Sequence, residues 1–297
     1  MSLRSQKTRW VMFLPCTKPT DLLRHVMDLV YGVYCLEQAG VDPQRIHIYI
    51  DSCGQNTDSS FFEASTFRYQ SKPTDDFFSD LTQNTDENLV MFVSGHGGLF
   101  GLDANPPISP SKIISALKAT PNLKTAVLYL GQCFAGTFNF VNAGKEEGEN
   151  IEIILAGATN LQESLSLSTS QQFLHQRLPW LANVFLLNVF SWFLEPKDID
   201  GDGKMTIMDS YKFAGILTNL INKQCKNGGF VMIMDMLQEY RDARNLAAND
   251  TGDPQINMTN KVNCDAKYRQ CIEQLGLHHI HQECWILNSR PAQKLEF

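Results

Sequence analysis

Two residues of complementary chemistry, His96 and Cys133, each follow a short apolar run and lie among small residues. His96 belongs to residues 94–98 (SGHGG), and Cys133 belongs to residues 131–136 (GQCFAG). A thiol close to an imidazole transfers its proton and becomes a thiolate nucleophile. Small neighbouring residues let a substrate backbone approach and leave backbone N–H groups free. The pattern predicts a Cys–His site in which the N–H groups of Gly97 and Cys133 bind an oxyanion.

The elements that must position this pair are short apolar strands alternating with helical stretches. Runs typical of buried strands are residues 10–14, 46–50, 89–93, 126–130 and 151–156. Helical spacing is found over residues 20–38 and 109–119. This alternation predicts an α/β fold with a mostly parallel sheet covered by helices on both faces. His96 and Cys133 follow consecutive strands, and ligands bind beyond the carboxyl ends of such strands.

A single cysteine or histidine at a strand end is more often a structural residue than a catalytic one. Here both occur in glycine-rich turns after consecutive strands of one predicted sheet. Their joint occurrence is what indicates a site.

The second half of the chain has a different pattern. Residues 171–194 are expected to be mostly helical with a break at Pro179, since proline interrupts a helix. Further helices are expected over residues 207–225, 230–246 and 264–275, with a loop over 249–260. The sequence thus predicts an α/β core over residues 8–170 and a helical part over 171–297, which is either separate from the core or integral to it.

The residues around His96 and Cys133 resemble the paired motifs of the caspase, metacaspase and legumain clan of cysteine peptidases. Residues 31–49 are similar to the helix and second strand of legumain-like enzymes, and residues 156–164 (AGATNLQES) to the segment after the nucleophile strand. The resemblance extends from Arg9 to Ser170. It implies a caspase-like three-layer fold, Cys133 as nucleophile, His96 as general base or acid, and a peptide or protein substrate held by one side chain in a deep pocket.

One position departs from the family pattern. Many metacaspases and legumains carry an acidic residue two places before the nucleophile, where it helps to form the pocket, and this chain has Gly131 there. Asp103 or Glu163 is expected to supply a carboxylate instead. Together with Ser164, they are the candidate substrate-binding residues. The side chain preferred at the cleavage site is left open.

Two other functions compete with a cysteine endopeptidase. A caspase-like binding or scaffold protein would keep the motifs but have little turnover. Intact His96 and Cys133 favour the enzyme, while the glycine at 131 leaves room for the scaffold. A class I glutamine amidotransferase also raises a cysteine on a strand-to-helix turn. However, its motif has glycine two residues on either side of the cysteine and its histidine follows, whereas Gly136 is three residues after Cys133 and His96 precedes it.

An acidic loop over residues 198–209 (DIDGDGKMTIMD) matches the EF-hand pattern. Carboxylates at positions one, three and five, a glycine at six and a backbone carbonyl at seven are the ligand arrangement that Ca²⁺ prefers. Aspartate at position twelve, in place of glutamate, resembles the dockerin type of loop. The sequence predicts a calcium site, structural or regulatory, whose ligands are Asp198, Asp200, Asp202, Lys204 and Asp209.

Composition excludes several other classes. A formal net charge of −7 argues against general nucleic-acid binding, which needs clustered lysine and arginine. No apolar run is long enough for a membrane span, and the start of the chain lacks a signal-peptide pattern. A cytoplasmic location with eight reduced cysteines is therefore the default expectation, and the oligomeric state is left open.

Overall fold

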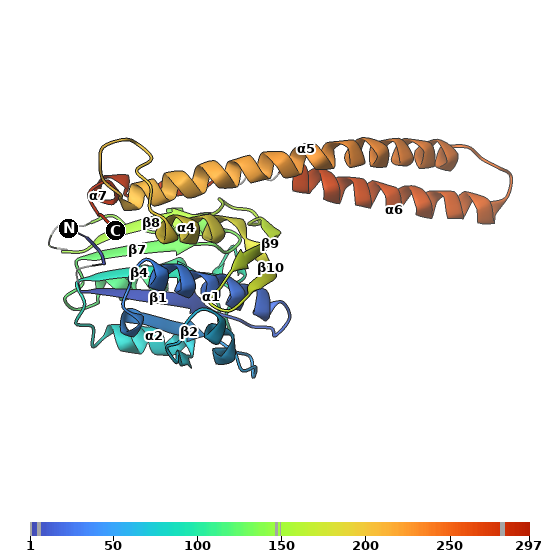
Figure 1. Cartoon of the computed structure of the whole chain (residues 1–297). Helices are drawn as coiled ribbons and strands as arrows, with labels where there is room; N and C mark the ends of the chain where they lie inside the picture. Colours follow the sequence, from blue (N-terminus) through green and yellow to red (C-terminus); the bar gives the residue numbers. More distant parts are fainter. Residues whose placement is uncertain (1, 5–6, 146–147, 149, 280–282) are drawn as a thin grey trace. The chain divides into compact units, whose positions relative to one another are not determined.

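The computed structural model describes residues 2–4, 7–145, 148, 150–279 and 283–297. Its centre is a seven-stranded sheet in the order β11-β8-β7-β4-β1-β2-β3 (Figure 1). The strands are β1 (Thr8–Leu14), β2 (Ile46–Ile50), β3 (Ser71–Lys72), β4 (Asn88–Val93), β7 (Thr125–Leu130), β8 (Glu152–Gly157) and β11 (Trp285–Leu287). All neighbours pair in parallel except β11, which runs antiparallel to β8. The predicted α/β fold with a mostly parallel sheet is confirmed.

Helices cover both faces of this sheet, because its central strands are apolar on both sides. Along β1, Trp10, Met12 and Leu14 belong to one core, and Val11 and Phe13 belong to the other. The first core is closed by α1 (Leu22–Gln38) and α4 (Val184–Leu194), and the second by α2 (Thr74–Leu81) and α3 (Pro110–Lys118).

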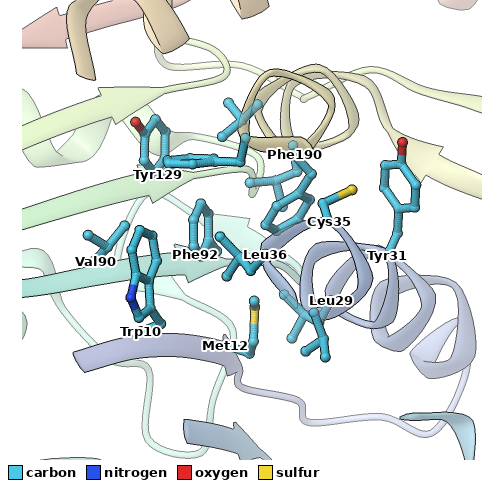
Figure 2. Packing of buried hydrophobic residues seen from close by; sticks show 14 of the residues in the cluster. Trp10, Met12, Leu29, Tyr31, Cys35, Leu36, Val90, Phe92, Tyr129 and Phe190 are labelled. Carbon is cyan, nitrogen blue, oxygen red and sulfur yellow. The ribbon is translucent and has the colours of Figure 1, made fainter. Parts of the chain in front are cut away.

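The first core is rich in aromatic side chains. Figure 2 shows Trp10, Phe92 and Tyr129 on three neighbouring strands, with Phe190 of α4 and residues of α1 on one side of them. The Phe92 and Tyr129 rings stack with centroids 5.2 Å apart, and the Phe92 and Phe190 rings lie 4.7 Å apart. Such rings bury large apolar areas and lock the strands against the helices.

The segment over residues 171–194, expected to be mostly helical with a break at Pro179, is helical only over Val184–Leu194, and the prediction was wrong for the part before it. Strands β9 (Ser166–Gln172) and β10 (Arg177–Asn183) form an antiparallel hairpin, and only then does α4 begin. In β10 the inward residues Trp180 and Ala182 alternate with exposed neighbours, which is the period of a strand. Pro179 is compatible with a two-stranded ribbon, because such a strand has an edge that needs no N–H donor.

The helices of the C-terminal half are longer than the sequence suggested. A single helix α5 (Ile207–Ala248) runs through Gly228 and Gly229, and α6 (Pro254–His279) follows after a short turn. The chain divides into one compact unit of Met1–Thr218 with Gln282–Phe297 and a second of Asn219–His281. The boundary expected after residue 170 falls inside β9.

The second unit contains residues 219–248 of α5 and the whole of α6, and these two helical segments lie side by side (Figure 1). Tyr240 and Tyr268 face each other across the two helices with ring centroids 5.4 Å apart, and Lys267 Nζ lies 2.6 Å from Glu239 Oε2. Within the described residues, none of the helices is both long and apolar enough to cross a membrane.

Candidate active site

The ends of β4 and β7 bring the His96 and Cys133 segments together. The last residues of the two strands, Val93 and Leu130, pair in register, and the N–H of Gly131 donates to the carbonyl oxygen of Val93 at 2.9 Å. Beyond this pair, a Cβ placed on Gly97 would lie only 2.3 Å from the Cys133 carbonyl oxygen. Only glycine permits this approach, so the two motifs are in direct backbone contact.

The chain turns sharply immediately after Cys133. Phe134 has a φ of 55°, in the left-handed region that costs energy for a residue with a side chain. Its N–H donates to the carbonyl oxygen of Gln162 at 2.8 Å, which fastens the turn to the segment after β8. Through the same segment, the backbone N–H of Ser164 points at the Cys133 Sγ at 3.3 Å. This contact places a hydrogen-bond donor directly beside the Cys133 sulfur.

His96 is exposed, whereas a second histidine beneath it is buried. The ring of His25 in α1 meets the His96 ring edge to face, with centroids 4.9 Å apart and planes at 80°. Burial lowers the pKa of His25 to about 3, and the charges of Arg24 and His96 act in the same direction. His25 is therefore neutral under ordinary conditions, and its Nδ1 lies 3.2 Å from Ser94 Oγ.

A buried carboxylate, Asp28, lies below the same strand ends. Its Oδ1 accepts from the indole N–H of Trp180 at 2.9 Å and from the backbone N–H of Asn183 at 3.1 Å, and its Oδ2 accepts from Ser94 Oγ at 3.2 Å. Burial raises the pKa of Asp28 to about 7, because the loss of water outweighs these hydrogen bonds.

Asn183 completes the connection to the nucleophile. Its side-chain Oδ1 caps α4 by accepting from the N–H of Leu186 at 2.9 Å, and its Nδ2 donates to the Gly131 carbonyl at 2.6 Å and to Ser164 Oγ at 2.9 Å. Ser164 is the residue whose N–H reaches the Cys133 sulfur.

Sequence reasoning missed His25, Asp28 and Asn183. A signal for the first two was present, since they are polar residues on the apolar face of the helix over residues 20–38, beside Val26 and Leu29. Their partners are Ser94 after β4, Trp180 in β10 and Asn183 before α4, so the contacts themselves could not be read from the helix.

The candidate substrate-binding residues lie in three different settings. Ser164 is in contact with Cys133, as described. Asp103 is held near the histidine segment, because its N–H donates to the His96 carbonyl at 3.1 Å and its Oδ2 accepts from Thr17 Oγ1 at 2.8 Å. Glu163 is exposed next to Ser164.

The glycine at the position of the expected pocket acid has a structural explanation. A Cβ on Gly131 would lie 2.5 Å from Leu186 Cδ1 and 3.0 Å from the Val93 carbonyl oxygen. Leu186 of α4 thus fills the space that an acidic side chain would need at residue 131.

The acidic loop brings together three of its five expected ligands. One carboxylate oxygen from each of Asp198, Asp200 and Asp202 lies within 4.8 Å of the others. The fully buried Asp209 is engaged elsewhere, because its two oxygens accept the N–H groups of Ile199 at 2.9 Å and Thr206 at 2.8 Å. The backbone N–H of Lys204 donates to Asp202 Oδ1 at 2.9 Å.

No family model and no curated protein matches this chain. Among solved structures, it is similar to a secreted C11 cysteine protease from Bacteroides thetaiotaomicron, determined by X-ray crystallography in complex with an irreversible peptide inhibitor. The likeness has a TM-score of 0.35 and 9% sequence identity, and it covers 73% of this chain and 59% of the protease chain. This chain thus spans less than two thirds of that protein. We therefore base the function on the chain's own residues.

Proposed function

We propose that this chain is a cysteine peptidase of the caspase-like clan that cleaves peptide bonds with Cys133 as nucleophile and His96 as general base and acid. The observation that carries the proposal is the backbone contact between Gly97 and Cys133, which joins the two motifs at neighbouring strand ends. The N–H of Ser164, 3.3 Å from the Cys133 sulfur, supports Cys133 as the nucleophile. The motif resemblance described above agrees with this assignment.

In the proposed reaction His96 accepts the thiol proton, and the Cys133 sulfur attacks the carbonyl carbon of the peptide. A C–S bond forms, and the carbonyl π electrons move to the oxygen, where the N–H groups of Gly97 and Cys133 stabilise the charge. As the carbonyl re-forms, the C–N bond breaks and His96 returns the proton to the leaving amine. Water, with His96 again as base, then hydrolyses the thioester.

Trapping with a peptide-based electrophile tests this function. We expect the reagent to label Cys133 faster than the exposed Cys225, and Cys133→Ala to abolish cleavage of a peptide library. Since general base catalysis contributes roughly 10²–10⁴ in rate, His96→Ala is expected to slow cleavage by about a hundredfold or more. Labelling of Cys133 no faster than Cys225, with no cleavage in the library, would leave the binding or scaffold protein as the better function.

We also propose that the loop over residues 198–209 binds a calcium ion through Asp198, Asp200 and Asp202. The clustered carboxylates support this site, because three oxygens in one place attract a hard cation. The Lys212 ammonium group lies 2.7 Å from Asp200 Oδ2 and supplies a positive charge beside the three carboxylates. Asp209 closes the loop by its hydrogen bonds to the backbone. The proposed role of calcium is structural or regulatory.

A calcium titration followed by thermal unfolding tests the metal site. A ligand that binds only the folded state stabilises by about 2.7 kcal/mol at a hundred times its dissociation constant. We expect calcium to raise the melting temperature of the natural chain but not of the double variant Asp200→Asn/Asp202→Asn. Asp250→Asn, an exposed acid in the turn between α5 and α6, is the matched control and is expected to retain the full shift.

A further inference from the structure

Asp28 stands at the point where two paths of contacts meet, one leading through hydrogen bonds and a ring contact to His96 and one through hydrogen bonds to Cys133. It is only 2% exposed, and the three hydrogen bonds that its carboxylate accepts come from residues outside its own helix α1. Ser94 follows β4, Trp180 lies in β10, and Asn183 precedes α4. A buried carboxylate needs such partners, since an unsatisfied one is costly.

The path toward His96 fixes the state of His25. When Asp28 is ionised, Ser94 donates its hydroxyl proton to Asp28 Oδ2, and the Ser94 oxygen then accepts the Nδ1–H of neutral His25. In this tautomer His25 Nε2 carries the lone pair, and among the described residues it has no hydrogen-bond partner. The His25 ring, held in this way, makes the edge-to-face contact with the His96 ring.

The path toward Cys133 runs through Asn183. Asp28 Oδ1 accepts the Asn183 N–H, and the Asn183 side chain donates to the Gly131 carbonyl and to Ser164 Oγ. Gly131 precedes the nucleophile by two residues, and Ser164 donates its N–H to the Cys133 sulfur. Both donors of the Asn183 amide therefore act on segments that hold Cys133 in place.

We propose that Asp28 is a positioning residue that sets the His96 ring, through Ser94 and His25, and the Cys133 sulfur, through Asn183, in one common geometry. The inference rests on the proposed Cys133 nucleophile and extends it. It predicts that loss of the Asp28 carboxylate changes the reactivity of Cys133 without any contact between the two side chains, whereas a purely structural carboxylate changes only stability.

The test compares Asp28→Asn with Asp86→Asn in the full chain, using alkylation of Cys133 by iodoacetamide as a function of pH. Asp86 is the matched control, because it is also buried and pairs with two cations, Arg45 at 2.6 Å and Arg9 at 3.4 Å, but precedes β4 at the other end of the strand from His96. The side-chain NH₂ of an asparagine at residue 28 would face N–H and O–H groups that are themselves donors. Buried hydrogens would then be left without an acceptor.

We expect Asp28→Asn to slow alkylation of Cys133 roughly tenfold or more and to move the midpoint of its pH profile upward. Asp86→Asn is expected to lower the melting temperature but to leave rate and profile within about twofold of the natural chain. Equal rates and profiles in both folded variants would overturn the proposal.

Ser94→Ala decides the matter if Asp28→Asn does not fold. This variant removes only the hydroxyl between Asp28 and His25 and leaves the Trp180 and Asn183 contacts intact. We expect it to slow alkylation roughly threefold or more with an altered pH profile, and an unchanged rate and profile would overturn the proposal.

The natural chain separates this inference from the proposed function. If its Cys133 reacts no faster than Cys225, the peptidase assignment fails. If Cys133 is activated but Asp28→Asn and Ser94→Ala react as the natural chain does, only the role of Asp28 fails.

Discussion

At Gly97 a single added carbon would separate the two strand ends, because the Cys133 carbonyl oxygen already occupies the place of a side chain. We predict that Gly97→Ala reduces labelling of Cys133 by a peptide electrophile roughly tenfold or more, since a displacement of about 1 Å suffices for a large loss of rate. The neighbouring glycine provides the control. A Cβ on Gly98 meets no atom within 4 Å, so Gly98→Ala is expected to label as the natural chain does. Equal losses in both variants would mean that the contact with Cys133 is not what matters.

His47 in β2 makes the stability of the chain depend on pH. Burial lowers its pKa to about 4, and Arg9 and Lys72 lower it further while Asp86 and Asp80 oppose them. Because the unfolded pKa is near 6.5, the unfolded chain binds the extra proton between these values. The contribution of His47 is therefore complete above about pH 6.5 and is lost as the pH falls toward 4.

We predict that His47→Gln flattens the dependence of unfolding free energy on pH between 4 and 6.5, as measured by denaturant unfolding. His25 gives a slope of the same sign, with a pKa of about 3, so the variant removes only part of the slope. Asp28 gives the opposite sign, because its pKa is raised to about 7 and its contribution falls as the pH rises from about 4 to 7. Parallel curves for variant and natural chain would contradict the prediction.

At the scale of elements, the strands that carry the site were predictable because they are apolar on both faces. The runs over 89–93 and 126–130 correspond to β4 and β7 within a residue, and the glycine turns after them hold His96 and Cys133. The hairpin of β9 and β10 was not recognised, because residues 171–194 join a half-buried strand to a fully apolar helix without a glycine between them. Asp28 was missed for a related reason, because Trp180 and Asn183 reach its carboxylate only when that hairpin packs on α1.

Two glycines in the second unit are predicted to have opposite effects on its stability when replaced by alanine. Gly228 is an exposed residue in the middle of α5 with open space around its Cα, so Gly228→Ala is expected to stabilise the helix by about 1 kcal/mol. Gly252, in the turn to α6, has a φ of 75°, and Gly252→Ala is expected to cost about 1–2 kcal/mol. Hydrogen exchange of the α5 and α6 amides measures both effects, and a change of the same sign in the two variants would contradict them.

For the whole molecule, both hydrophobic cores are built without the second unit. Their residues lie between Leu3 and Ala214 or between Cys284 and Phe297. The two segments of the first unit that flank the second are also in contact, because the Tyr211 hydroxyl donates to the carbonyl oxygen of Cys284 at 3.0 Å.

We therefore predict that replacing residues 219–282 with a short glycine–serine linker gives a chain that still unfolds in one cooperative transition. Iodoacetamide labelling of Cys133 at the rate of the full chain is the second expected result. A shortened chain without a cooperative transition would show that the first unit depends on the segment removed.

The antiparallel strand β11 has a consequence for the order in which this protein is made. It pairs with β8, and Phe297 packs on Trp10 and Phe193, yet both follow the second unit in the chain. A ribosome adds about 5–20 residues per second, so the edge of β8 waits for several seconds, unpaired and apolar, while α5 and α6 are translated. During that interval the nascent chain presents an open sheet edge to any other strand. Joining residues 283–297 ahead of the second unit, by circular permutation, would shorten the wait and reduce misfolding during synthesis.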